Sequence, residues 1–138
     1  MKNLFCSIIG AVGSGIAYLL GGWNEALVTL LIFMGIDYIS GLIVAGVFHK
    51  SKKTENGALE SKASFKGLCK KGMILFFVII GARLDLVTGS DFIKNAVCIS
   101  FMVNELISIT ENAGLMGLPI PKVVTNAIEV LKNKEVTN

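Results

Sequence analysis

Four long apolar runs, separated by short polar segments, dominate the hydropathy pattern of this chain. They cover roughly residues 4–21, 26–48, 72–88 and 92–109. A membrane-spanning helix needs about 17–25 predominantly apolar residues, so each run is close to spanning length and the third is the shortest. The pattern therefore predicts an all-α membrane protein with four transmembrane helices.

A fifth segment, residues 119–133, has helical periodicity but too many polar residues to span a membrane. It opens on a Pro-Ile-Pro sequence, and proline fits the first turn of a helix. Its apolar positions are Ile120, Val123, Val124, Ala127, Ile128 and Leu131, and its polar positions are Lys122, Thr125, Asn126, Glu129, Lys132 and Asn133. This spacing indicates an amphipathic, interfacial C-terminal helix that lies on the inner membrane surface or packs against its copies.

Composition agrees with a membrane protein of one domain, residues 1–138. The chain is 53% hydrophobic and 17% charged, with a mean hydropathy of +0.69. Soluble domains have about 45–50% apolar and about 25% charged residues. A cleaved signal peptide is the alternative for the first run, but a second apolar run follows after only residues 22–25, which favours a retained helix.

The sequence contains no arrangement of residues that is typical of a catalytic or metal-binding site. The three cysteines have no CxxC spacing, and the single histidine has no metal-binding neighbours in sequence. No nucleophile–base–acid set or phosphate-binding loop is present. We therefore expect no enzyme activity, no catalytic residue, no metal and no cofactor.

Lysine is concentrated in the segment between the second and third runs, residues 49–71, which carries seven lysines. The turns at residues 22–25 and 89–91 contain no Lys or Arg. The positive-inside rule then places both termini and the basic loop in the cytoplasm.

The basic loop is first of all a topology signal, and contact with anionic lipid head groups is a second interpretation. Each lysine near such a surface contributes about 1 kcal/mol to the attraction. Nucleic acid binding is disfavoured. The lysines that we expect to face lipid include Lys50, Lys52, Lys53, Lys66, Lys70 and Lys71.

Asp37 is the only charged residue within the second run, and Arg83 and Glu105 lie within later ones. Such a group costs about 2.5–3.5 kcal/mol at the bilayer centre unless it is paired or hydrated. Asp37 shares a helix face with Gly41 and Ala45, and Ser40 lies beside it. The carboxylate therefore points to another helix. Its partner stays open, because Arg83 can pair with Asp37 or with its near neighbour Asp85.

Two further faces indicate helix packing. In the fourth run, Asn104 and Ser108 belong to a polar stripe of period four flanked by Glu105, which needs water, polar partners or a neighbouring subunit. In the first run, Gly13, Ala17 and Gly21 recur every four residues, a spacing that lets helix backbones approach closely. The partner of that face can be in the same chain or in another.

Four motifs occur in order along the chain: DYISG at 37–41, SFKGLCKK at 64–71, NELISITEN at 104–112 and GLPIPK at 117–122. Their order and spacing resemble the toxin-secretion/phage-lysis holins of Gram-positive bacteria and their phages, the group that includes the clostridial toxin-secretion holin. The resemblance covers the chain from the second apolar run to the amphipathic C-terminal segment.

The resemblance implies a non-enzymatic, multi-pass protein of the bacterial cytoplasmic membrane. Such holins form homo-oligomers and open lesions at a set time, which release an endolysin or a large protein toxin. An antiholin is a further candidate partner. Among the motif positions, Asp37, Asn104 and Glu105 are the polar contacts that we expect to control assembly.

Two other functions stay open from the sequence. A small four-helix multidrug transporter would use Asp37 as its proton-coupling carboxylate, but its decisive acid is expected in the first helix, which has none. The long basic loop and amphipathic tail also fit a transporter poorly. An antiholin or structural membrane subunit of the same family would have the same motifs without forming lesions.

Overall fold

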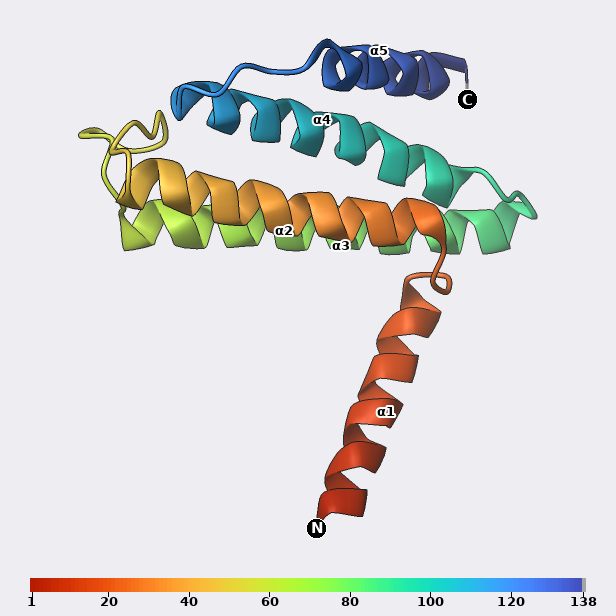
Figure 1. Cartoon of the computed structure of the whole chain (residues 1–138). Coiled ribbons are helices and arrows are strands. Elements are labelled where there is room, and N and C mark those ends of the chain that lie inside the picture. The colour runs from red at the N-terminus through yellow and green to blue at the C-terminus, as the bar shows by residue number, and fades with distance from the viewer. Residues whose placement is uncertain (138) are drawn as a thin grey trace.

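The computed structural model describes residues 1–137 and contains five helices. They are α1 (Lys2–Leu19), α2 (Glu25–Gly46), α3 (Ser61–Thr88), α4 (Ile93–Leu115) and α5 (Lys122–Thr137). The predicted all-α class is confirmed. α4 is the central helix, because it packs against α2, α3 and α5, whereas α2 and α3 touch each other little (Figure 1).

Apolar side chains of α2, α3 and α4, with Leu20 from the turn after α1, form one core at the end of the bundle where the short turns lie. Its fully or nearly buried members are Leu20, Leu27, Leu30, Met34, Val78, Cys98 and Met102. Gly81 lets α3 approach α4 closely there, since an added Cβ would lie 3.1 Å from the Lys94 Cα. The bundle is therefore tightly packed near the two short turns.

Three helices, α1, α2 and α4, are long and apolar enough to cross a membrane. α3 does not meet that criterion, because its last eighteen residues already include Lys71, Arg83 and Asp85. The predicted count of four spans is thus not confirmed by length and composition alone.

α3 begins at Ser61, whereas the hydropathy pattern placed its start near residue 72. Its 28 residues give a length of about 42 Å, more than the roughly 30 Å of a bilayer core. The segment SFKGLCKK is therefore helical, and the connecting loop shrinks to residues 47–60. Hydropathy missed this first part because helical structure continues past the apolar boundary into the lysine-rich sequence.

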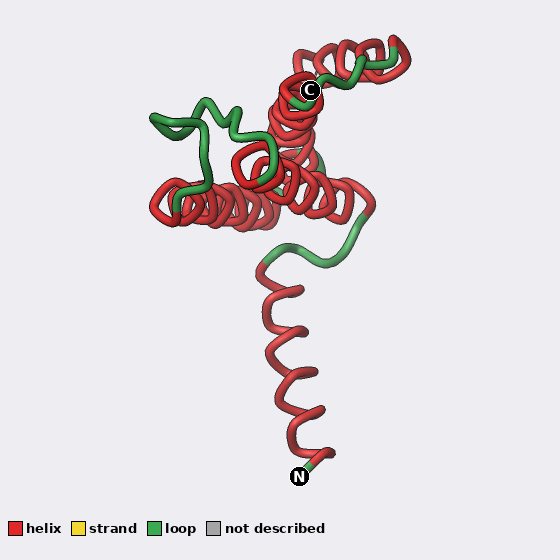
Figure 2. The backbone as a smooth tube through the Cα atoms, turned by 60° about the vertical axis from the view of Figure 1, so that its left-hand side comes forward, coloured by secondary structure: helices red, strands yellow, loops and turns green. Residues whose placement is uncertain are grey.

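α1 stands apart from the other helices (Figures 1 and 2). It has no buried residue, and it touches only α3. It ends at Leu19, so Gly21 lies in the turn, not in the helix as predicted, and adopts φ 78°. Gly13 has no neighbour within 4 Å of a virtual Cβ. A Cβ added at Gly21, by contrast, would lie 3.0 Å from the Ala82 Cβ, so only the turn approaches α3 closely. Within residues 1–137 the small face of α1 itself has no close partner helix, and pairing with another chain stays a prediction.

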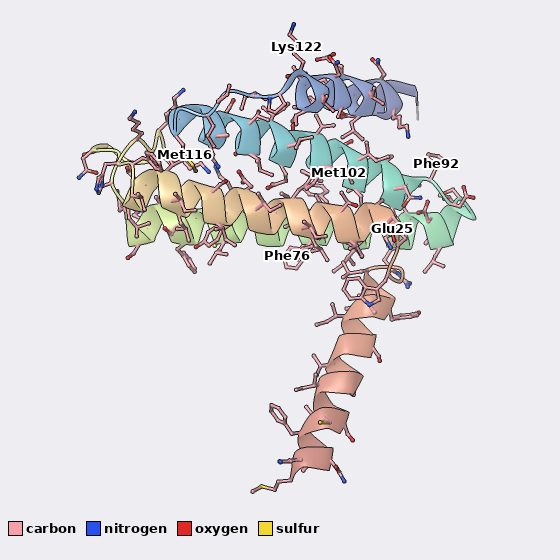
Figure 3. All side chains as sticks on the ribbon, viewed as in Figure 1. Glu25, Phe76, Phe92, Met102, Met116 and Lys122 are labelled. Carbon is pink, nitrogen blue, oxygen red and sulfur yellow. The ribbon has the colours of Figure 1, made fainter. Side chains whose placement is uncertain are left out.

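α5 folds back against α4. Ile128 is buried, and Leu131 packs against the core. The predicted amphipathic helix is therefore present, but it begins at Lys122 and not at residue 119, and Val123 of its predicted apolar face is exposed. In Figure 3, Phe76 marks the opposite, apolar side of the bundle.

Candidate functional site

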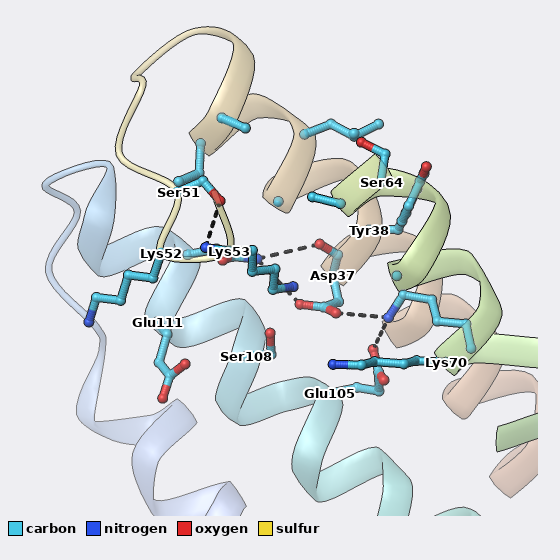
Figure 4. A pocket seen from close by; sticks show the side chains of 18 of the residues that line it. Asp37, Tyr38, Ser51, Lys52, Lys53, Ser64, Lys70, Glu105, Ser108 and Glu111 are labelled. Carbon is cyan, nitrogen blue, oxygen red and sulfur yellow. Dashed lines mark hydrogen bonds and ion pairs between the residues drawn. The ribbon is translucent and has the colours of Figure 1, made fainter. Parts of the chain in front are cut away.

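A polar cluster joins three helices in the half of the bundle nearer residues 47–60. The Lys71 Nζ lies 2.8 Å from the Asp37 Oδ2 and 2.6 Å from the Glu105 Oε2. The three side chains are only 14%, 7% and 8% exposed, respectively. We call Asp37, Lys71 and Glu105 the polar clasp; Figure 4 shows the two carboxylates with their interactions as dashed lines.

Helix geometry brings the clasp residues to one level. Asp37 lies nine residues before Gly46 and Glu105 lies ten before Leu115, so each is about 14–15 Å from the C-terminal end of its helix. Lys71 shares a face of α3 with Val78, seven residues further on. Lys71 therefore lies on the core-facing side of α3, and its ammonium group contacts both carboxylates.

Asn112 extends this network along the predicted polar stripe. Its Nδ2 donates to the Ser40 Oγ at 2.9 Å and to the Asp37 Oδ1 at 3.3 Å. The Ser40 hydroxyl in turn donates to the Asp37 carbonyl at 3.0 Å. A Cβ added at Gly41 would lie 3.8 Å from the Asn112 Nδ2, so a small residue leaves room for this amide. The DYISG and NELISITEN motifs therefore meet at this site.

The clasp holds two carboxylates against one ammonium group. Buried charges are tolerated only where they are paired or reached by water. A cavity of 480 Å³ between α2, α3, α4 and the 47–60 loop reaches the clasp, and Asn104, Ser108 and Glu111 also line it. In Figure 4, Lys52 and Lys53 lie beside the same cavity. Pairing, together with the cavity that reaches the clasp, explains how the charges persist.

Lys71 corrects two sequence interpretations. It is not a lipid-facing loop lysine, because it lies in α3 and is part-buried against carboxylates. It also takes the place proposed for Arg83, which is exposed at the other end of α3 and forms no ion pair within residues 1–137. The opposite direction of α2 and α3 explains this, since it brings the start of α3, not its end, to the level of Asp37.

The other lysines of the predicted basic loop divide between two elements. Lys50, Lys52 and Lys53 lie in the 47–60 loop, whereas Lys66 and Lys70 lie on α3. All five are exposed. Their contact with lipid stays a prediction.

A second polar cluster closes the opposite end of the bundle. Asp85 accepts hydrogen bonds from the Ser90 Oγ at 2.7 Å and from the backbone N–H groups of Ile93 and Lys94 at 2.9 and 3.0 Å. It therefore caps the start of α4 and does not pair with Arg83. The buried Lys94 donates from Nζ to the Gly22 carbonyl at 2.7 Å. Sequence reasoning missed Lys94, since nothing in its neighbourhood signals a carbonyl partner 72 residues away.

We expect Asp85→Ala to destabilise the bundle by loosening the start of α4. The substitution removes the acceptor for two backbone N–H groups, and losing a helix cap costs about 0.5–2 kcal/mol. Thermal unfolding of the purified protein in mild detergent measures the effect. Asp91→Ala is the matched control, because Asp91 is exposed in the same turn. Equal melting temperatures for the two variants would contradict the capping role.

The fold and site define a class: a small helical membrane protein with an ion-pair network between its helices. Within residues 1–137, no group of His, Cys, Asp and Glu side chains is arranged to hold a metal ion. The profile of the Bacteriophage holin family matches residues 14–133. The chain belongs to this family, whose members are generally non-enzymatic membrane proteins.

Similar proteins occur in Clostridium perfringens and Listeria innocua. An uncharacterized protein of Clostridium perfringens strain 13 is 32% identical over 95% of this chain and 94% of its own length. An uncharacterized 14.9 kDa protein from the nagH 3' region of Clostridium perfringens is 32% identical over 98% of this chain and its full length. An uncharacterized protein of Listeria innocua is 38% identical over 91% of this chain and 86% of its own. No solved structure matches the chain.

Proposed function

We propose that this protein is a holin, which assembles with its copies in the bacterial cytoplasmic membrane and opens lesions there. Those lesions release an endolysin or a large protein toxin. Family membership supports this function. The polar clasp is the observation that supports its mechanism, because it is a nearly buried ion-pair network that joins three helices.

The clasp supplies an element that can exist in two arrangements. In the single chain, Lys71 bridges Asp37 and Glu105, so each carboxylate has an ion-pair partner within the chain. In an assembly, the same groups can instead contact neighbouring subunits or water. A protein with two such states changes from one to the other when its copies bind the second state better. We propose that opening of the clasp accompanies assembly.

The proposed orientation follows the lysine distribution. Residues 47–60 and both termini lie in the cytoplasm, with the two short turns outside. The exposed lysines of the loop and of the first turns of α3 then face anionic head groups of the inner leaflet. The last two-thirds of α3 then cross the membrane. Lys71 can lie within the membrane because its charge is paired with Asp37 and Glu105 in the polar clasp.

Inducible expression in bacteria tests the holin function. A holin is expected to stop growth and collapse the membrane potential abruptly after a delay, and co-expression of an endolysin should then lyse the culture. Gradual tolerance to cationic drugs without killing would support a transporter. Correct insertion with neither effect, together with delayed killing by a related holin, would support an antiholin.

Single cysteines in an otherwise cysteine-free chain report the topology. We expect a membrane-impermeant thiol reagent to label Asp91→Cys in intact cells, because this exposed turn residue faces outside. Glu55→Cys in the loop and Lys2→Cys should react only after the membrane is permeabilised. Labelling of Glu55→Cys in intact cells before lysis would overturn the orientation. Labelling of Lys2→Cys alone would mean that α1 does not span.

A further inference from the structure

The cavity beside the polar clasp has a wall on α3 that is also exposed on the outside of the bundle. Its volume is 480 Å³, within the roughly 300–1,000 Å³ that is usual for ligand sites. Met73 and Phe77 line the cavity, and they are 48% and 41% exposed. In the proposed orientation this part of α3 lies in the inner half of the bilayer. A lipid molecule can therefore enter the cavity from the side without leaving the membrane.

One end of the cavity is apolar. Ile74 and Phe77 of α3 and Phe101 of α4 line it. The ring centroids of Phe77 and Phe101 are 5.8 Å apart. Phe77 lies seven residues after Lys70, which is about 10 Å further along α3. These side chains offer no hydrogen-bonding group to a polar ligand, so this end suits a hydrocarbon chain.

The other end of the cavity is formed by the 47–60 loop, whose shape is fixed by internal hydrogen bonds. The Ser51 N–H donates to the Gly57 carbonyl at 3.0 Å, and the Lys53 N–H donates to the Ser51 Oγ at 3.2 Å. Gly57 adopts φ 75°, and a Cβ added there would collide with the His49 carbonyl oxygen. The loop thus holds the backbone of Lys52 and Lys53, which line the cavity (Figure 4), in a defined position.

Charged side chains of both signs line the cavity outside the polar clasp. They are Lys52, Lys53, Lys70, Glu60 and Glu111, and none of them forms an ion pair within residues 1–137. Thr54 lines the same end, and its Oγ1 is buried with no hydrogen-bond partner in that range, although such atoms normally have one. An anion alone would pair only with the lysines. A ligand that carries a phosphate and an ammonium group complements both signs.

We infer that the cavity binds one phospholipid of the inner leaflet whose head group joins a phosphate to a primary ammonium. Lys52, Lys53 and the Thr54 hydroxyl donate to the phosphate, and Glu60 and Glu111 accept from the ammonium. One acyl chain lies along the apolar end, and the rest of the lipid stays in the bilayer. This inference rests on the proposed membrane orientation and does not depend on lesion formation.

Tryptophan quenching tests the occupied cavity. In a Trp23→Phe background, Phe77→Trp places the only tryptophan at the cavity, and Phe76→Trp is the matched control, because Phe76 is 60% exposed and does not line the cavity. The protein in mild detergent is titrated with phosphatidylethanolamine whose chains carry bromine, a quencher of tryptophan. We expect quenching of Phe77→Trp to saturate near one lipid per chain, and that of Phe76→Trp to rise only gradually.

Native mass spectrometry of the unchanged chain gives a second measurement, which does not depend on the tryptophan variants. One retained phosphatidylethanolamine per chain is expected. A gradual rise for both tryptophans, together with no retained lipid on the unchanged chain, would overturn the inference.

Head-group substitutions test the polar contacts. Phosphatidylcholine has no N–H group to donate and phosphatidylglycerol has no cation, so each should bind about tenfold more weakly than phosphatidylethanolamine. Lys52→Gln/Lys53→Gln should also weaken binding about tenfold. Lys50→Gln/Lys66→Gln is the matched control, because these exposed lysines lie outside the cavity, and it should bind as the wild type does. Equal affinities for the three lipids, or equal losses in the two lysine pairs, would overturn the head-group assignment.

The lipid site and the holin function fail separately. Abrupt killing by a chain that shows no saturable lipid binding would refute the lipid site and leave the holin function in place. Saturable binding of phosphatidylethanolamine by a chain that never kills would support the site and refute the holin function.

Discussion

Lys71→Met is expected to cause the largest loss of stability of any single substitution in the polar clasp. It leaves Asp37 and Glu105 without the ammonium group that both contact. Removing one partner of a buried ion pair costs about 3–5 kcal/mol, because the remaining charge stays desolvated. We expect poor accumulation in the membrane and a large fall in melting temperature in detergent. Lys70→Met, an exposed neighbour on the same helix, is the control.

A triple variant separates lost charge balance from lost packing. Asp37→Asn and Glu105→Gln, added to Lys71→Met, leave no uncompensated charge in the clasp. Replacing a whole buried ionic group by neutral residues is often nearly neutral for stability. The triple variant should therefore recover much of the melting temperature that Lys71→Met alone loses. If the triple variant is as unstable as the single one, the role of Lys71 is packing and not charge compensation.

Helix positions could be predicted from hydropathy, but the partner of Asp37 could not. The Asp37–Gly41 face and the Asn104–Ser108 stripe each indicate a polar contact, because period-four spacing fixes which side chains share a face, but neither says which helix is the partner. The positive-inside rule counts lysines without regard to the side of a helix on which they lie, so it places Lys71 among the loop lysines. The position of Lys71 around the helix axis does indicate burial, because Lys71 lies on the same side of α3 as the buried Val78.

Arg83, the candidate partner left open for Asp37, is separated from it for a related reason. A pair between residues of two spanning helices forms only if both side chains point inward. The structure shows Arg83 exposed, whereas the adjacent Ala82 is buried. One residue changes helix phase by about 100°, so depth without phase cannot identify a pair.

The docking of α5 could not be read from its sequence. An amphipathic helix has the same pattern whether its apolar face, centred on Ile128, covers lipid or another helix. The choice depends on the exposed surface of α4 and on how far residues 116–121 reach along it. Those are properties of the assembled bundle and not of the segment itself.

Asp37→Asn is expected to bring forward the onset of lysis. α2 and α3 touch each other little, so the Asp37–Lys71 ion pair is a principal link between them. The amide keeps the side-chain shape and leaves Glu105 and Lys71 as a balanced pair. The closed state then loses about 1–3 kcal/mol, which shifts a two-state equilibrium about 5- to 150-fold toward the open state. Onset is measured at matched protein levels after induction.

Two comparisons make this result specific to the clasp. Glu105→Gln keeps the link between α2 and α3, so it should advance the onset less than Asp37→Asn. Arg83→Gln should leave the onset unchanged, and its effect should simply add to that of Asp37→Asn, because the two side chains do not interact. An unchanged onset of lysis in Asp37→Asn would show that the polar clasp does not control when lysis begins. A non-additive effect with Arg83→Gln would show that Asp37 meets Arg83 in the assembled state, where a neighbouring subunit can bring them together.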